Sequence, residues 1–198
     1  KTNSQIAKKL PLLERYVQSH TLLSAYKKMI PAFDGIAEFW FDSYKDFQQA
    51  EGSQEFEGLK RDCLNFVDID KTIQMHVTEE VIKDNEVSLN GVKNIEFVVR
   101  KGGMAVDVFQ KYWKEVHGPL GSSIKTVNRY IQNHVVARAY EKSDQPELDG
   151  LAITWFDSTR EMKESALSEE YASTRGDEEN FLTIPLDFII TKEYVIVE

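Results

Sequence analysis

A long internal repeat runs through this chain. FDGIAEFWFDS at 33–43 returns as LDGLAITWFDS at 148–158, and ERYVQSH at 14–20 returns as NRYIQNH at 128–134. The offset between the copies stays almost constant, which indicates that one stretch of sequence was duplicated. Solenoid repeats are only about 20–50 residues long. The sequence therefore predicts a whole small domain that is present twice.

The second copy of the repeat is the more complete. A β-branched stretch bounded by glycines predicts a strand at 92–101, and apolar residues at helical spacing predict a helix at 105–117 that ends at Gly118-Pro119. The predicted elements that follow are two strands, a helix and a last strand region, at 128–141, 148–158, 159–174 and 181–198. This β-α-β-β-α-β order is typical of the ferredoxin-like fold.

The two copies are predicted to form domains at 1–85 and 90–198, of which the first lacks the opening strand. We expect the true N-terminus to lie upstream of Lys1; the alternative is that another segment takes the place of this strand. Helices cover one face of each sheet, so the two helix-free faces are expected to pack together. The predicted fold class is α+β, with two ferredoxin-like repeats forming an intramolecular pseudo-dimeric α/β barrel around a cavity.

Composition argues against several classes of function. The net charge of −9 disfavours a nucleic-acid partner, because phosphate binding needs a basic patch. No apolar run approaches the roughly 20 residues that cross a bilayer, so no membrane partner is expected. The single cysteine, Cys63, fits a reducing compartment and predicts a cytoplasmic protein. We expect no metal and no cofactor, and we expect the acidic stretch at 176–180 to be solvated surface.

Polar side chains recur on one face of the repeated strand. Tyr130, Gln132 and His134 alternate along the second copy, and Tyr16 and His20 repeat the pattern in the first. Such a row is an unusual filler for a core between helices and sheet, so we expect it to line the cavity. The alternative is a structural row of satisfied hydrogen bonds.

Three further residues are candidates for binding a ligand. Trp40 and Trp155 occupy equivalent positions in the two copies and are expected to line the cavity or the core. Glu38 stands where the second copy has Ile153, which introduces a carboxylate into one half.

His117 is the strongest candidate for acid-base chemistry. Free imidazole titrates near pH 6.5, so it exchanges protons at neutral pH. Its place before Gly118-Pro119 predicts that it lies at a helix end, at the rim of the barrel. The alternative is a cap on the last helical carbonyls. Tyr112 and Trp113 share helical spacing with Phe109 and are expected to pack on the sheet.

The motifs VFQKYWKEVHGPL, NRYIQNH and the DG…WFDS strand, in this order, resemble the EthD-like family, named for ethyl tert-butyl ether degradation. The resemblance covers 92–198 and, in truncated form, 3–82. It implies a ferredoxin-like fold, a dimeric α/β barrel and a pocket near His117. Members of the family include auxiliary proteins of ether oxidation, lactone isomerases and polyketide dehydratases. Asn3 stands in the first copy where the second has His117, so a single site in the second half is expected.

Three functions remain open from the sequence. The first is a cofactor-free lyase or isomerase for a small hydrophobic or aromatic metabolite, with His117, Tyr130 and His134 as catalytic residues. The second is a non-catalytic accessory or ligand-binding protein that supports an oxygenase or ether degradation. The third is haem chemistry, which no feature of the sequence selects. The chain is expected to be an internal pseudo-dimer, and a further homodimer remains open.

Overall fold

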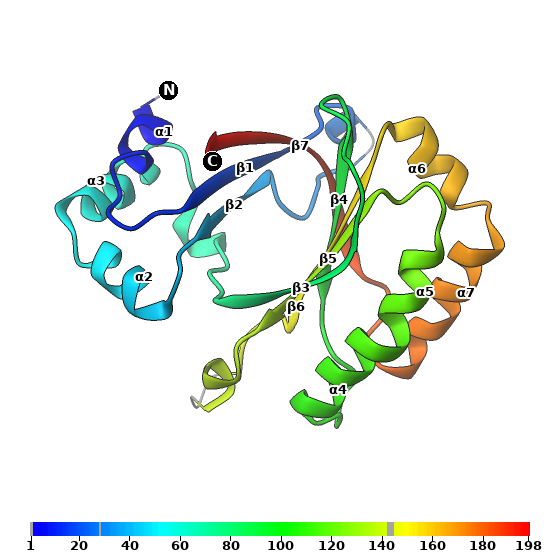
Figure 1. The fold of residues 1–198 in the computed structure, drawn as a ribbon. Coiled ribbons are helices and arrows are strands. Elements are labelled where there is room, and N and C mark those ends of the chain that lie inside the picture. Colours follow the sequence, from blue (N-terminus) through cyan, green and yellow to red (C-terminus); the bar gives the residue numbers. More distant parts are fainter. Residues whose placement is uncertain (1, 28, 142–144) are drawn as a thin grey trace. The chain divides into compact units, whose positions relative to one another are not determined.

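The computed structural model describes residues 2–27, 29–141 and 145–198 (Figure 1). Contacts divide the chain into two compact units. The first unit consists of Lys1–His20, Asp34–Gln74 and Glu193–Glu198, and the second of Thr21–Phe33 and Met75–Lys192. The first unit therefore includes the C-terminal segment of the chain, and the second includes an internal segment, Thr21–Phe33, from the first half.

The second unit contains an antiparallel sheet in the ferredoxin-like order. β4 (Val92–Val98) pairs on one side with β6 (Gly150–Phe156) and on the other with β7 (Asp187–Val197). β6 also pairs with β5 (Arg129–Val135), which gives the order β7-β4-β6-β5. β3 (Val77–Asp84), the last strand of the first copy of the repeat, pairs with β5 and extends this sheet.

Helices cover one face of this sheet (Figure 1). The first helical segment runs from α4 (Val106–Tyr112) through a π-helical turn (Trp113–His117) into α5 (Gly118–Ser123). The second consists of α6 (Thr159–Ser165) and α7 (Glu169–Asp177), followed by a short 3-10 turn at Glu178–Asn180. Ser158 and Ser168 cap α6 and α7 by accepting backbone N–H groups of the first turn, which explains why two helices replace the single one predicted.

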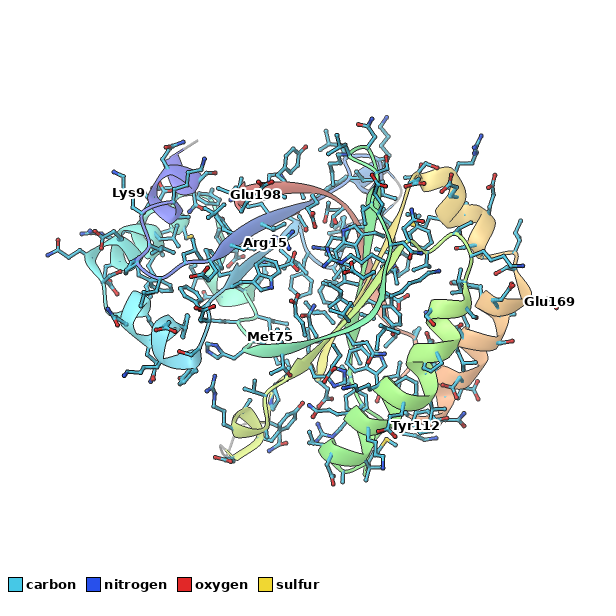
Figure 2. The ribbon with its side chains drawn as sticks, in the orientation of Figure 1. Lys9, Arg15, Met75, Tyr112, Glu169 and Glu198 are labelled. Carbon is cyan, nitrogen blue, oxygen red and sulfur yellow. The ribbon has the colours of Figure 1, made fainter. Side chains whose placement is uncertain are left out.

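The core of the second unit lies between these helices and the sheet, where side chains fill the space (Figure 2). Phe109 and Trp113 are almost fully buried and meet Phe156 and Phe181 in one apolar cluster. The prediction that Tyr112 and Trp113 pack toward the sheet is therefore confirmed, with Tyr112 at the edge of the cluster.

The prediction that the first helix ends at Gly118-Pro119 is wrong. The N–H of Gly118 donates to the carbonyl of Trp113, five residues back, and the chain continues directly into α5. Pro119 lies in the first turn of α5, where its missing N–H costs little. His117 consequently lies inside a continuous helical segment.

The first unit is the smaller of the two. β1 (Arg15–Thr21) pairs antiparallel with β2 (Gly35–Trp40), and three helices accompany this pair: α1 (Thr2–Ala7), α2 (Tyr44–Glu51) and α3 (Gln54–Cys63). Ala7, Leu10, Tyr16 and Leu59 form its buried cluster. Short 3-10 turns occupy Ile69–Lys71 in the first unit and Ala25–Lys27 and Ala137–Glu141 in the second. The predicted α+β class with ferredoxin-like repeats is confirmed. None of the helices in the described ranges has the length and apolar character of a membrane span.

Candidate functional site

The Tyr130-Gln132-His134 row of β5 faces the helices. Gln132 donates from Nε2 to the carbonyl of Trp113 at 2.8 Å and to the hydroxyl of Tyr130 at 3.0 Å. The ring of His134 stacks on that of Trp113, with 4.5 Å between centroids. The expectation that this row lies on the helix-free face is therefore wrong. A polar row is tolerated in this core because its groups hydrogen-bond to one another and to the helix backbone.

The first unit repeats the same hydrogen-bonded row. Gln18 donates to the hydroxyl of Tyr16 at 2.6 Å, and Nε2 of His20 lies 3.3 Å from Oε1 of Gln18. The equivalent contact in the second unit joins His134 Nε2 to Gln132 Oε1 at 3.1 Å. Since both copies keep these bonds, the row has a structural function in each unit.

His117 forms a buried pair with Asp177, which ends α7. Nδ1 of the imidazole lies 3.0 Å from Oδ2 of the carboxylate, and both side chains are at most 10% exposed. Asp177 also accepts hydrogen bonds from Tyr112 at 2.7 Å and from Asn180 at 3.0 Å. An ionised carboxylate only accepts, so Nδ1 carries the hydrogen and Nε2 is left as the proton-accepting atom.

Burial governs the charge of this pair. It lowers the pKa of His117, because a cation is poorly solvated there, and the contact with Asp177 opposes the shift. Burial also acts on Asp177 and would raise its pKa, but hydrogen bonds from Tyr112, Asn180 and His117 keep the pKa of this carboxyl below its usual value. At neutral pH the pair is therefore a neutral imidazole beside a carboxylate.

His117 and Tyr130 line the same cavity, of about 60 Å³, between the sheet and the helices. Ile124, Val127 and Phe156 form part of its apolar wall. Tyr130 is 3% exposed, and its hydroxyl accepts hydrogen bonds from Trp113 Nε1 and Gln132 Nε2. Burial raises the pKa of Tyr130, against the effect of those two donors, so the phenol remains protonated.

A charged cluster borders the same cavity. Nη1 of Arg175 lies 2.7 Å from Oε1 of Glu178 and 3.0 Å from Oε1 of Glu96. Burial raises the pKa of Glu178 to about 7, although Arg175 opposes the shift. Burial likewise raises the pKa of Glu96, and the guanidinium of Arg175 again opposes the shift. Two carboxylates thus compete for one cation in a poorly solvated place.

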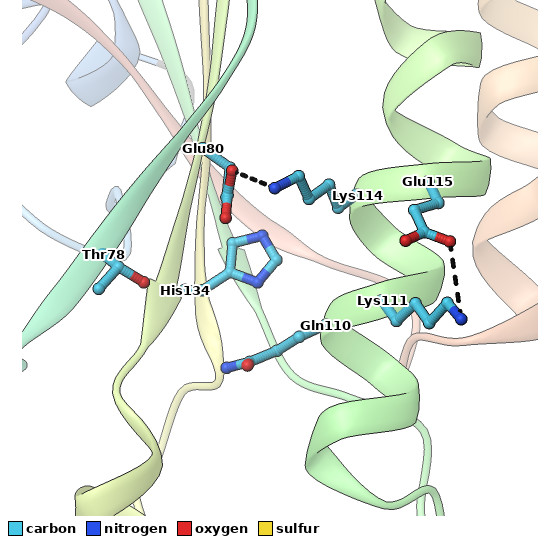
Figure 3. A pocket seen from close by; sticks show the side chains of 7 residues that line it. All are labelled: Thr78, Glu80, Gln110, Lys111, Lys114, Glu115 and His134. Carbon is cyan, nitrogen blue, oxygen red and sulfur yellow. Dashed lines mark ion pairs between the residues drawn. The ribbon is translucent and has the colours of Figure 1, made fainter.

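His134 lies in a different and more open depression, of about 180 Å³ (Figure 3). Its imidazole points from β5 toward the helix that carries Gln110 and Lys114 (Figure 3). Lys114 forms an ion pair with Glu80 of β3 at 2.6 Å. Burial lowers the pKa of His134 to about 4, so this ring is neutral at physiological pH. The structure therefore brings two of the three predicted catalytic residues to one cavity and His134 to another.

The described residues that line the His117 cavity include none of the six predicted ligand-binding residues. Trp155 is buried and alternates along β6 with Thr154 and Phe156, which face that cavity, so its side chain projects to the opposite face. Lys93 and Arg129 lie over its ring, at 4.9 and 5.3 Å from the centroid.

Five other ligand-binding candidates remain. Gln132 is described above, and the other four belong to the first unit. The guanidinium of Arg15 lies 4.9 Å from the ring of Trp40, and Glu38 accepts a hydrogen bond from Ser19 at 3.3 Å. Tyr16 and His20 belong to the hydrogen-bonded row of β1. A role in ligand binding stays a prediction for all of them.

Sequence reasoning missed the acidic partners of the site. The expectation that 176–180 is solvated surface is wrong for Asp177 and Glu178, whose side chains are 10% and 4% exposed. One signal was available, because Asp177 has an aspartate counterpart, Asp62, in the first copy. Within the described ranges, no group of three or more His, Cys, Asp or Glu residues could hold a metal ion.

The fold and the site define the class of this protein: a ferredoxin-like α+β protein with a histidine–aspartate pair buried between helices and sheet. The family model for the EthD domain matches residues 3–70 and 101–185, and the chain belongs to the EthD family. The two matched segments fall in the two copies of the repeat, as the resemblance predicted. No curated protein matches the chain.

Solved structures share this fold at low sequence identity. An "anthrone oxidase-like protein" has a TM-score of 0.60 and 10% identity, over 100% of this chain and 84% of that chain. A "putative monooxygenase" from Lactobacillus acidophilus NCFM has a TM-score of 0.56 and 10% identity, over 98% of this chain and 87% of that chain. Another protein of that name, from Fusobacterium nucleatum subsp. nucleatum ATCC 25586, has a TM-score of 0.55 and 7% identity, over 98% of this chain and 84% of that chain. At these identities the likeness concerns the fold alone.

Proposed function

We propose that this EthD-family protein is a cofactor-independent lyase or isomerase acting on a small, oxygen-bearing and otherwise hydrophobic metabolite. One observation carries the proposal: His117 and Tyr130 line one cavity and offer it complementary groups. The first is a neutral base, and the second is a hydroxyl whose proton is available for donation.

His117 serves as the base. Asp177 holds the Nδ1–H, so the tautomer is fixed and Nε2 accepts the proton. Among the described residues, no group hydrogen-bonds to Nε2. The lowered pKa of His117 keeps the imidazole neutral at neutral pH, so that Nε2 can accept a proton.

Tyr130 serves as the oxygen-polarising group. Its oxygen accepts bonds from two fixed neutral donors, Trp113 Nε1 at 3.2 Å and Gln132 Nε2 at 3.0 Å. In the part of the chain that the structure describes, its own O–H has no acceptor. That hydrogen is therefore available to a carbonyl oxygen of the ligand, where it stabilises developing negative charge.

The chemical step follows from these two roles. Nε2 of His117 takes a proton from carbon next to a carbonyl, and the electron pair of the broken C–H bond moves toward the carbonyl oxygen, which Tyr130 binds. An isomerase returns the proton to another carbon. A lyase instead returns it to a leaving hydroxyl group, which departs as water. No oxidation or reduction occurs in either case.

The cavity limits what can enter. Ligand pockets for drug-sized molecules measure about 300–1,000 Å³. The cavity here, of about 60 Å³, accommodates only the reacting end of a ligand. The apolar wall of Ile124, Val127 and Phe156 favours a hydrocarbon or aromatic carbon frame next to the carbonyl.

The test is proton exchange in heavy water. The protein is incubated with a panel of lactones, β-hydroxy ketones and aromatic ketones, and loss of the α-proton signal is followed by NMR. His117→Ala is expected to lower the exchange rate by about 10²–10⁴-fold, and Tyr130→Phe should lower it as well. Val116→Ala, which changes the half-exposed neighbour of His117 in the same helical segment, is the matched control. Equal exchange by wild type and His117→Ala would reject the proposal.

A second candidate is a non-catalytic ligand-binding protein. The observation in its favour is that the depression at His134 is three times larger than the cavity at His117 and more open. On this hypothesis the same panel would bind without exchange. Binding weakened by His134→Gln and unaffected by His117→Ala would support it.

A further inference from the structure

We propose that Glu96 and Glu178 hold a single shared proton on either side of Arg175, so that Glu178 is a second proton-transfer group in the His117 cavity. The shared proton follows from the geometry of this cluster alone. The catalytic use of that proton rests on the function proposed above.

The geometry places both carboxylates on one nitrogen. Oε1 of Glu178 lies 2.7 Å and Oε1 of Glu96 3.0 Å from Nη1 of Arg175. Glu178 comes from the turn after α7 and Glu96 from the middle of β4, so the guanidinium is clamped between helix and sheet. All three residues line the cavity that His117 and Tyr130 also line.

The count of charges favours an additional proton on one of the two carboxylates. Two ionised carboxylates and one guanidinium leave a net charge of −1, and Asp177 next in sequence adds another negative charge. The side chain of Glu178 is 4% exposed, so water compensates this excess poorly. Like-charged carboxylates that share a site of this kind ionise one at a time.

The groups that face Glu178 support this assignment. From α7 they are Tyr171, Arg175 and Asp177; from β4 and β5, Glu96 and Tyr130; and from the π-helical turn, His117. Arg175 is the one permanent cation among them, and it is already shared. Burial, followed by the charges of Glu96 and Asp177, raises the pKa of Glu178 to about 7, while Arg175 opposes the shift.

Glu178 is the better proton donor of the pair. Its Oε1 is bound to Arg175, and no hydrogen bond reaches Oε2 from any residue in the described ranges. A proton on Oε2 can therefore pass to a ligand oxygen or carbon after His117 has removed one from the ligand. The imidazolium of His117 then returns its proton to the Glu178 carboxylate, through solvent or directly, and the site is restored.

The experiment is a ¹³C NMR titration of the protein labelled at the glutamate carboxyl carbons. In wild type, one glutamate signal should titrate with a midpoint of about 7. That signal should vanish in Glu178→Gln and persist in Glu179→Gln, which changes the exposed neighbour. In Glu96→Gln the midpoint should fall by at least about one pH unit, since the competing carboxylate is gone.

Three results would overturn the proposal. The first is a wild-type spectrum in which every glutamate titrates near its ordinary pKa of about 4.3. The second is a neutral-range signal that survives in Glu178→Gln. The third is a neutral-range signal that keeps its midpoint in Glu96→Gln, and this result decides the matter even if Glu178→Gln fails to fold. The titration needs no substrate, so a failure of the proton-exchange assay would reject the proposed reaction and leave the shared proton standing.

Discussion

Nδ1 of His117 lies 3.0 Å from Oδ2 of Asp177, and this contact joins the two helical segments of the second unit. The first copy of the repeat keeps an aspartate, Asp62, at the position of Asp177 but has Asn3 at the position of His117. Asn3 instead accepts a hydrogen bond from Tyr16 and donates to Cys63. Both copies thus keep an aspartate, but only the second copy places a titratable histidine opposite it.

Asp177→Asn should lower the pKa of His117 further. The contact with Asp177 raises this pKa against the effect of burial, and an amide cannot supply the negative charge. A ¹⁵N NMR titration of the imidazole should show a lower midpoint and a mixture of tautomers. Asp107→Asn, an exposed change on α4, is the control. An unchanged midpoint and tautomer in Asp177→Asn would show that the carboxylate does not hold the ring.

Gln132→Leu should destabilise the fold more than the equivalent Gln18→Leu. Gln132 is fully buried and bonds to Trp113, Tyr130 and His134, whereas Gln18 is only partly buried. Unsatisfied buried polar groups cost about 1–3 kcal/mol each, so a loss of about 2 kcal/mol is expected for Gln132→Leu and under about 1 kcal/mol for Gln18→Leu. Denaturant titrations measure both. Equal losses would contradict the view that burial sets the cost.

Replacing either of two helical glycines with alanine should change the stability of the fold, in opposite directions at the two positions. A Cβ at Gly121 in α5 would lie 2.8 Å from Cε1 of Tyr130, so Gly121→Ala should cost about 1–3 kcal/mol and displace the Tyr130 ring. A Cβ at Gly176 in α7 meets no atom within 4 Å, so Gly176→Ala should stabilise by about 0.5–1 kcal/mol. Thermal unfolding distinguishes the signs. A stabilising Gly121→Ala would mean that the helix shifts freely over the sheet.

His134 should make the fold weaken in acid. Burial lowers its pKa from 6.5 to about 4, so the unfolded chain takes up a proton that the folded chain refuses. Stability should therefore fall as the pH drops from about 6.5 toward 4, by up to about 3 kcal/mol from this group. His134→Gln should remove this contribution to the pH dependence of stability, and His20→Gln should leave the pH dependence unchanged. Parallel stability curves for wild type and His134→Gln between these pH values would refute the assignment.

Much of the architecture could be predicted from the pattern of residues. The repeat, the β-α-β-β-α-β order and the packing of Trp113 all rest on local periodicity and on similarity between the two copies. The continuation of the helix past Gly118-Pro119 could not be predicted, because it depends on one backbone bond from Gly118 to Trp113 that creates a π-helical turn. This turn also places His117 inside the helical segment and toward the core.

The sequence by itself determined that two copies of one ferredoxin-like unit are present. It also determined that His117 of the second copy has an asparagine, Asn3, as its counterpart in the first. Tertiary structure decided what that histidine meets. Strand alternation shows which residues share a face but does not say which face the helices cover, so the row of Tyr130, Gln132 and His134 could be assigned only from packing. Asp177 and Glu178 look like solvated charges in sequence, and their burial follows from where the end of α7 docks on the sheet. Burial of these groups, rather than their identity, sets their protonation and hence their chemistry.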